Sequence, residues 1–259
     1  MRNHLKYFCI FIFSAQAFFA QNKPVELKNK IPLKVDQFQG TDKYGNIYYF
    51  KNNVFYKFGK DGNFHFSDLQ LGKPTSSDLI NPLKIVLFYE AMNTLVLLDH
   101  HLIEIARINF NRLEKFKTLR HASEASGDKI WLFNIDNQQL EIFDYIQKKT
   151  IASSQPLASK VLDIVSDFNF CWILTENVLA KYNTYGSLLE KTANIGFEEL
   201  VEDNGNLVAQ KDNTLFNRHK SSTEFEELQL PIINIKDFYL NDKNLYIYDG
   251  EILHEFHLN

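Results

Sequence analysis

Short apolar runs separated by polar turns recur along this chain about every 38 residues. In six places an acidic or amide turn leads directly into an apolar run, and one residue of each run marks the repeat. These markers are Phe55, Leu102, Leu140, Leu179, Leu215 and Leu253, with spacings of 47, 38, 39, 36 and 38 residues. Another β-rich run precedes each turn, and an earlier run ends in a polar turn of its own. A repeat near 40 residues that holds several strands is typical of propeller blades, which cannot bury their faces alone.

Each repeat therefore predicts three strands, A, B and C, with a fourth candidate such as residues 64–69 or 188–195. We predict an all-β chain that forms a six-bladed β-propeller of four-stranded antiparallel blades. The sixth repeat ends at Asn259, directly after its third strand. The extended segment 25–31 is expected to pair beside residues 252–258 and to close the last blade, because an open seam would leave an exposed strand edge.

The domain organisation follows from the continuity of the repeat. The sequence has no Pro-, Gly- or Ser-rich break long enough to be a linker, so residues 21–259 are predicted to form one propeller domain. The widest interval, Gln70 to Leu83, is interpreted as a long loop between the first two blades. Hydrophobic residues make up 45% of the chain and aromatic residues 14%, which is sufficient for one large core.

The first twenty residues have the layout of a secretory signal peptide. Arg2 and Lys6 precede the apolar run 7–13, and small residues follow it, with candidate cleavage sites after Ala17 and Ala20. A membrane span needs about 20 predominantly apolar residues, and polar side chains interrupt this run. We therefore expect an exported protein that does not itself span a membrane.

Cysteine usage and net charge indicate where the protein is located and which classes of partner it can bind. Removal of the leader would leave Cys171 as the remaining cysteine, and we expect it to be a buried thiol beside Trp172. Export without a disulfide predicts a bacterial periplasmic protein. Without Arg2 and Lys6 the chain has 26 basic and 32 acidic residues, a formal charge of −6. Nucleic acid is therefore not an expected partner, because phosphate binding needs a basic surface.

Motifs for catalysis, metal binding or phosphate binding are not evident, and we predict no catalytic residue, metal ligand or cofactor. His254 and His257 are three residues apart, so on a strand they would point to opposite faces. His100 and His101 lie in a predicted hairpin turn, which we interpret as a solvated turn, with a metal or ligand site as the alternative.

Several carboxylates fall on or beside the predicted inner strands. They are Asp163, Asp167, Glu199, Glu202, Asp203 and Asp237. A propeller hydrolase or lactonase, or a binder of a small ligand or glycan, would use such groups in the axial channel. The favoured interpretation is that they face a watery channel or form turns, which require Asp and Asn in any case.

Two segments carry a resemblance to known proteins. Residues 45–49, followed by 53–58 and 61–63, resemble a blade of the NHL-type and two-component-regulator-type propellers, and residues 182–186 resemble the end of such a blade. The resemblance implies a propeller architecture and identifies no activity. A small, exported, disulfide-free propeller with aromatic-rich strands is also similar in kind to the periplasmic plug subunit of the type IX secretion translocon. That likeness implies a partner in an outer-membrane channel.

The preferred function is a non-enzymatic periplasmic scaffold that presents one rigid face to another cell-envelope or outer-membrane protein. On the usual blade topology, the B–C turns and the long loop 70–83 share one face, which we predict to be the interface. Its candidate binding residues are Asn53, Lys73, Asp78, His100, His101, Asn137, Asn177 and Asn213.

Overall fold

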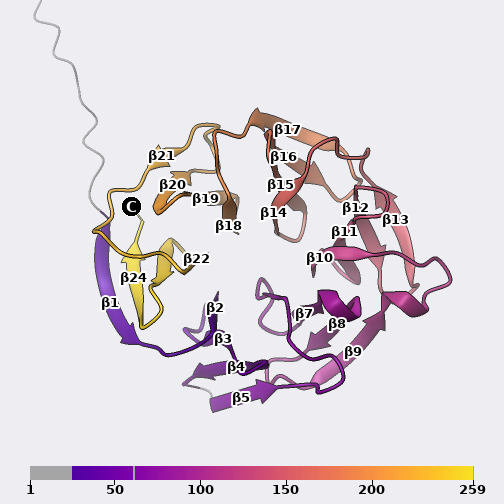
Figure 1. Ribbon diagram of the computed structural model, residues 1–259, viewed down its shortest axis with the longest axis horizontal. Helices are drawn as coiled ribbons and strands as arrows, with labels where there is room; N and C mark the ends of the chain where they lie inside the picture. The colour runs from indigo at the N-terminus through magenta and orange to yellow at the C-terminus, as the bar shows by residue number, and fades with distance from the viewer. Residues whose placement is uncertain (1–24, 61, 259) are drawn as a thin grey trace, which may run out of the picture.

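Six antiparallel four-stranded sheets surround a central axis in the computed structural model, which describes residues 25–60 and 62–258 (Figure 1). This confirms the predicted all-β six-bladed propeller. The helices among the described residues are two 3-10 turns, η1 (Glu90–Met92) and η2 (Phe110–Arg112). None of the helices in this part of the chain is long and apolar enough to cross a membrane. The predicted signal peptide and both of its cleavage sites lie outside the described residues.

The strands of each blade are named A to D from the axis outward. Blade one holds β2 (Gln37–Thr41), β3 (Ile47–Lys51), β4 (Val54–Gly59) and β5 (Gly62–Phe66); blade two holds β6 (Ser76–Asp78), β7 (Ile85–Tyr89), β8 (Thr94–Leu98) and β9 (Glu104–Asn109). Blade three holds β10 (Leu119–Glu124), β11 (Lys129–Asn134), β12 (Gln139–Asp144) and β13 (Lys149–Ser153); blade four holds β14 (Val161–Ser166), β15 (Phe170–Thr175), β16 (Val178–Asn183) and β17 (Leu188–Ala193). Blade five holds β18 (Glu199–Asp203), β19 (Asn206–Lys211), β20 (Thr214–Arg218) and β21 (Glu226–Glu227); blade six holds β22 (Asp237–Asn241), β23 (Asn244–Tyr248), β24 (Ile252–His257) and β1 (Glu26–Pro32).

The two ends of the described chain share blade six, as predicted. Strand β1 pairs antiparallel with β24, from Glu26 opposite His257 to Pro32 opposite Ile252. In Figure 1 the indigo β1 lies along the outside of the yellow β24. The chain then turns inward to β2, and the first blade follows the last around the ring.

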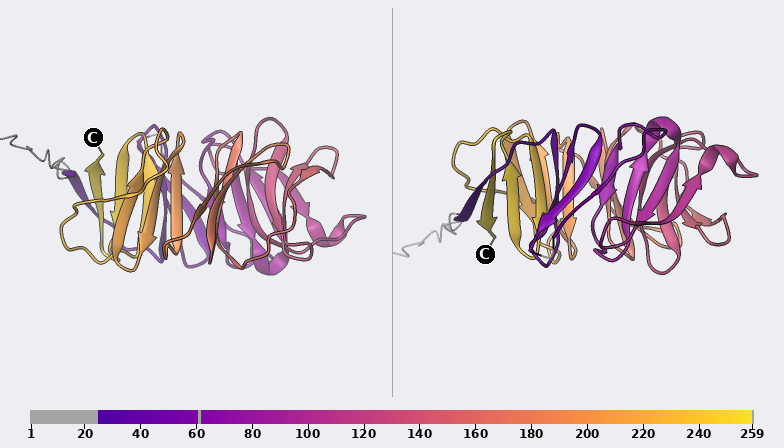
Figure 2. Two further views of the ribbon diagram at one scale, coloured as in Figure 1. Left: turned by 90° about the horizontal axis from the view of Figure 1, so that it is seen from above. Right: turned by 90° about the horizontal axis from the view of Figure 1, so that it is seen from below.

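The molecule has two distinct faces. Because neighbouring strands of a blade are antiparallel, the A–B and C–D turns lie at one end of the blade, and the B–C turns and interblade connections lie at the other. We call these ends the A–B face and the B–C face. Figure 2 shows the ring edge-on, with the turns gathered at these two ends.

The predicted register of blade two was wrong by one strand. Strand A is β6, which lies inside the segment 70–83 that we interpreted as a loop. Its sequence Ser-Ser-Asp lacks the apolar pattern of a strand because it borders the channel, so β7 was taken for strand A. Leu102 consequently lies in the C–D turn and not on strand C, where Leu95 occupies the position equivalent to Phe55. The spacing of 47 reflects this shift.

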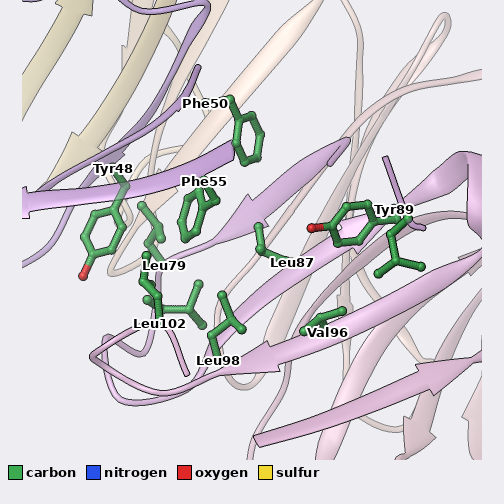
Figure 3. Close-up of a cluster of buried hydrophobic side chains, with 11 residues drawn as sticks. Tyr48, Phe50, Phe55, Leu79, Leu87, Tyr89, Val96, Leu98 and Leu102 are labelled. Atoms are coloured by element: carbon green, nitrogen blue, oxygen red, sulfur yellow. The ribbon is translucent and has the colours of Figure 1, made fainter. Parts of the chain in front are cut away.

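The core consists of apolar clusters between successive blades. Figure 3 shows the cluster between blades one and two, where Phe55 contacts Tyr48 and Phe50 and faces Leu87 and Leu98. All six marker residues of the repeat are buried, Leu102 included. Burying one such side chain contributes roughly 1.5–3 kcal/mol to the stability of the fold. The repeated residues are therefore the ones whose burial stabilises the ring. The Cys171 thiol is also buried and unpaired, as expected.

Candidate functional site

The six inner strands enclose a cavity of about 690 Å³ that opens on the A–B face. Strands β2, β6, β10, β14, β18 and β22 line it, together with the A–B turns of every blade but the third. Its polar lining includes Asp42, Lys43, Ser77, Asp78, His121, Ser123, Ser166, Asp167, Glu202, Asp203, Tyr239 and Asp242. The Tyr239 ring lies against Gly40, where an added Cβ would approach it to 2.7 Å, so the glycine leaves space for a phenol in the cavity.

Three inner-strand aspartates join one blade to the next. Asp78 Oδ2 accepts a hydrogen bond from the Glu124 backbone N–H at 2.6 Å. In the same way, Asp163 accepts from Leu200 at 2.7 Å and Asp237 accepts from Phe38 at 3.0 Å. These contacts connect blade two to three, four to five and six to one. Asp78, Asp163 and Asp237 therefore stabilise the ring, which supports a structural role over a catalytic one.

The cavity is strongly acidic. Six carboxylates line it (Asp42, Asp78, Asp167, Glu202, Asp203 and Asp242), and Lys43 is the one basic side chain of Lys or Arg type in the described lining. Burial raises the pKa of Glu202 to about 8, and the charges of Asp167, Asp203 and Asp78 act in the same direction. Burial also raises the pKa of Asp203. A cation that entered the cavity would relieve this repulsion, whereas an anion would increase it.

We expect the fold to become more stable by on the order of 1 kcal/mol as the pH falls from about 8.5 to about 6.5. The folded-state pKa of Glu202, about 8, lies above the unfolded value, so the folded state binds more protons between the two values and stability falls as the pH rises. Burial lowers the pKa of His121 to about 4, so protonation of this residue opposes the trend below about pH 6.5. Thermal unfolding over this pH range measures the effect.

Glu202→Gln should reduce that pH dependence, because the neutral amide removes one titrating group; Glu199, whose pKa burial raises to about 7, contributes the remainder with the same sign. Glu226→Gln is the matched control, since Glu226 is exposed on β21. A melting temperature that rises with pH between about 6.5 and 8.5 in the unmodified protein would contradict the assignment.

A histidine and two serines form a hydrogen-bonded chain on the cavity wall. His121 Nε2 lies 3.1 Å from Ser123 Oγ, which lies 2.6 Å from Ser166 Oγ. A neutral imidazole beside a hydroxyl is the arrangement that activates a serine nucleophile. Acyl transfer, however, also needs donors aimed at a developing oxyanion, and this cavity presents carboxylates. These carboxylates would repel a developing oxyanion.

The structure divides the eight predicted interface residues among three places. Asn53, Lys73, Asn137, Asn177 and Asn213 lie on the B–C face, in B–C turns or in the connection to blade two. Asp78 lies on inner strand β6 and lines the axial cavity. His100 and His101 lie on the A–B face, because their turn joins strands C and D of blade two. For the last three residues the predicted face was wrong, and the cause is the register error in blade two.

Two of the predicted asparagines have roles in folding. Asn213 donates to the Ile233 carbonyl at 2.8 Å and accepts from the Ile235 N–H at 2.9 Å. Asn177 Nδ2 donates to Ser159 Oγ at 2.8 Å. Both side chains connect a B–C turn to an interblade segment, so they are engaged within the chain and not free for a partner.

Exposed apolar side chains lie in turns of the A–B face, where Phe168 also lines the cavity, and the sequence did not indicate them as a site. They come from A–B and C–D turns: Tyr44, Leu83, Ile103, Ile146, Phe168 and Tyr185. Tyr185 is 80% exposed and Leu83 63%. The available signal was an apolar residue inside an otherwise polar turn, as in Asp167-Phe168-Asn169. The B–C face, in its B–C turns and interblade connections, also exposes apolar side chains, and none of these lines the axial cavity: Leu69, Met92, Phe116, Ile135, Ile195 and Ile232.

Comparisons with known proteins bear on the fold. No family model matches the sequence, and no curated protein matches it. The β-propeller domain of Cps50 (Swd1) from Myceliophteria thermophila has a TM-score of 0.64 at 8% identity, over 91% of this chain and 100% of that one. Virginiamycin B lyase from Staphylococcus aureus has a TM-score of 0.61 at 11% identity, over 90% and 100%. These likenesses show the propeller fold.

PorZ is a third structure of similar fold. It is described as an essential surface component of the type-IX secretion system of Porphyromonas gingivalis. The TM-score is 0.52 at 17% identity, over 84% of this chain and 31% of PorZ. The likeness therefore covers about a third of that longer protein and shows the fold of that part.

Proposed function

We propose that this protein is a non-enzymatic binding propeller of the bacterial cell envelope that holds a partner protein on its A–B face. The proposal depends on one observation, an acidic axial cavity that opens on the same face on which A–B and C–D turns expose apolar side chains. Apolar and aromatic side chains supply most binding free energy when a partner buries them, and carboxylates select a partner of opposite charge.

The chemistry of the face specifies the partner. A protein segment that carries Lys or Arg between apolar residues would place its cation in the cavity and its apolar side chains against Tyr44, Leu83 and Phe168. An acidic segment would meet the repulsion that already raises the pKa of Glu202. The preferred partner is therefore a basic, partly apolar segment of another envelope protein.

The proposed location is the periplasm, on the evidence of the signal-like residues 1–20. Within the envelope we propose a subunit of a protein-secretion translocon, with the type IX system as the specific candidate. Support comes from the resemblance in kind to the plug subunit of that translocon and from the fold shared with part of PorZ.

Site-directed photocrosslinking in detergent-solubilised cell envelope tests the proposal. A photoreactive phenylalanine analogue at position 44 or 168 is expected to crosslink to one partner of the same mass from both positions. The matched controls carry the analogue at positions 69 and 232, which are exposed on the B–C face. At about pH 9, where Glu202 is ionised, the double variant Glu202→Gln/Asp203→Asn should lower the crosslinking yield at least about tenfold, because the cavity loses two negative charges.

Crosslinks that form only from positions 69 and 232 would overturn the choice of face. A yield unchanged by the double variant would overturn the basic partner. The competing function, a hydrolase or small-ligand binder in the axial channel, predicts turnover or ligand binding that is lost in His121→Ala. Such a loss, without a crosslinked partner, would replace the scaffold proposal.

A further inference from the structure

The turn between β8 and β9 places one carboxylate and two imidazoles at a single point on the A–B face. The side-chain ligand atoms of Asp99, His100 and His101 all lie within 4.8 Å of one another. Both histidines are exposed, so their rings are accessible to an ion and free to adjust. Ligands of a tetrahedral zinc ion lie about 3.3 Å apart, a distance that small rotations of exposed side chains can reach.

The backbone of this turn is fixed from several sides. The Leu102 N–H donates to the Asp99 carbonyl at 3.0 Å, and the Asp99 N–H donates to the Ile103 carbonyl at 2.9 Å. Leu102 has a φ of 59° and a side chain that is only 3% exposed, which anchors the turn in the core. Lys57 of blade one donates to the His100 carbonyl at 2.9 Å. A preorganised backbone reduces the entropy that metal binding would otherwise remove.

The imidazoles of the turn are not used in folding. Among the described residues, four other histidines each have one ring nitrogen in a hydrogen bond: His121, His219, His254 and His257. The ring nitrogens of His100 and His101, like those of His65, have no hydrogen bond within this part of the chain, although the ring centroids of His100 and His101 lie 3.8 Å apart and His101 packs on Phe64. Asp99 Oδ1 accepts from the N–H groups of His101 and Ile103, which orients the carboxylate and leaves Oδ2 available.

We propose that Asp99, His100 and His101 form a surface site for a late divalent transition-metal ion, with Zn²⁺ as its representative. Two imidazoles and a carboxylate are ligands that Zn²⁺ and Cu²⁺ prefer, whereas Ca²⁺ and Mg²⁺ prefer oxygen ligands alone. Water or a donor from another molecule would complete the coordination. This site is independent of the proposed partner on the A–B face, because it needs only residues of one turn.

Isothermal titration of the untagged protein with Zn²⁺, in a buffer with excess Mg²⁺, tests the site. We expect one saturable site per chain that is weakened at least about tenfold in His100→Ala/His101→Ala. The matched control is His65→Ala/His219→Ala, which removes two exposed histidines elsewhere and should bind Zn²⁺ as the unmodified protein does. Bound Zn²⁺ should also raise the melting temperature of the unmodified protein and of the control, because it binds the folded state.

Absence of saturable Zn²⁺ binding would overturn the proposal. Binding that survives in the His100/His101 variant, or that falls equally in the control, would also overturn it and would place Zn²⁺ elsewhere, for example in the acidic cavity. Circular dichroism of both double variants establishes that each one folds, which keeps a loss of binding interpretable.

Discussion

Deletion of residues 25–33 is expected to lower the melting temperature by on the order of 10 °C and to make the protein prone to aggregate. The deletion removes β1 and exposes the edge of β24, whose residues Leu253 and Phe256 are fully buried in the intact ring. It also removes Ile31 and Leu33 from the cluster between blades six and one. A loss of several kcal/mol follows from the lost apolar burial alone. Differential scanning calorimetry and light scattering measure the two effects.

A permuted chain is the matched control for this deletion. Residues 26–33 are moved to follow Leu258 through a short Asn-Gly turn, which is compatible with the antiparallel register of Glu26 opposite His257. The same strand then closes the same blade with a different connection. Recovery of most of the lost melting temperature is expected. A deletion variant as stable as the full chain would show that β1 does not close the ring.

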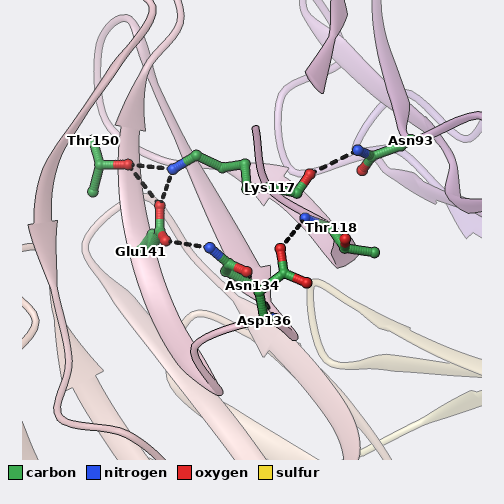
Figure 4. Close-up of polar contacts among 7 residues, drawn as sticks. All are labelled: Asn93, Lys117, Thr118, Asn134, Asp136, Glu141 and Thr150. Atoms are coloured by element: carbon green, nitrogen blue, oxygen red, sulfur yellow. Dashed lines mark hydrogen bonds and ion pairs between the residues drawn. The ribbon is translucent and has the colours of Figure 1, made fainter. Parts of the chain in front are cut away.

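Lys117→Met is expected to destabilise the protein by about 3–5 kcal/mol. Lys117 and Glu141 form a buried ion pair, with 9% and 5% of their side chains exposed. Figure 4 shows that Thr150 contacts both partners and that Asn134 donates to the other Glu141 oxygen, at 2.8 Å. Removal of the ammonium group leaves the buried Glu141 carboxylate without its cation. Chemical denaturation at neutral pH measures the change in free energy of unfolding.

The double variant Lys117→Met/Glu141→Leu is the informative control. It removes both charges, so it should recover a large part of the stability lost in Lys117→Met, because the cost arises from the unpaired carboxylate. Exposed Lys160 and Glu176, 4.0 Å apart, provide the comparison pair. Lys160→Met should change stability by no more than about 1 kcal/mol. Equal effects of the two lysine substitutions would contradict the role given to burial.

The repeat itself could be predicted from the sequence because every blade must bury the same strand positions against its neighbours. Leu140, Leu179, Leu215 and Leu253 lie on strand C, as the pattern indicated. The pairing of β1 with β24 was also predictable, since the last repeat lacked one strand. In blade two the pattern failed, because the inner strand β6 borders the channel and carries no apolar signal.

The candidate site could be predicted from the sequence less completely than the fold. Inner-strand carboxylates were recognised, but their separate roles depend on distances between blades: Asp163 joins two blades, whereas Glu202 lies in the acidic cavity. Which face a turn lies on depends on how many strands precede it in the blade. The error of one strand in blade two therefore led to a prediction of the wrong face for His100 and His101. The Lys117–Glu141 pair joins residues 24 apart and has no local pattern.

The sequence by itself determined the number of blades, the closing strand and the buried positions, because these follow from alternation and repetition along the chain. Only the tertiary structure decided which turns share a face, which carboxylates are paired, and that apolar turn residues share a face with the mouth of an acidic cavity. Those properties depend on where the six repeats meet around the axis, and the order of residues within one repeat does not specify that arrangement.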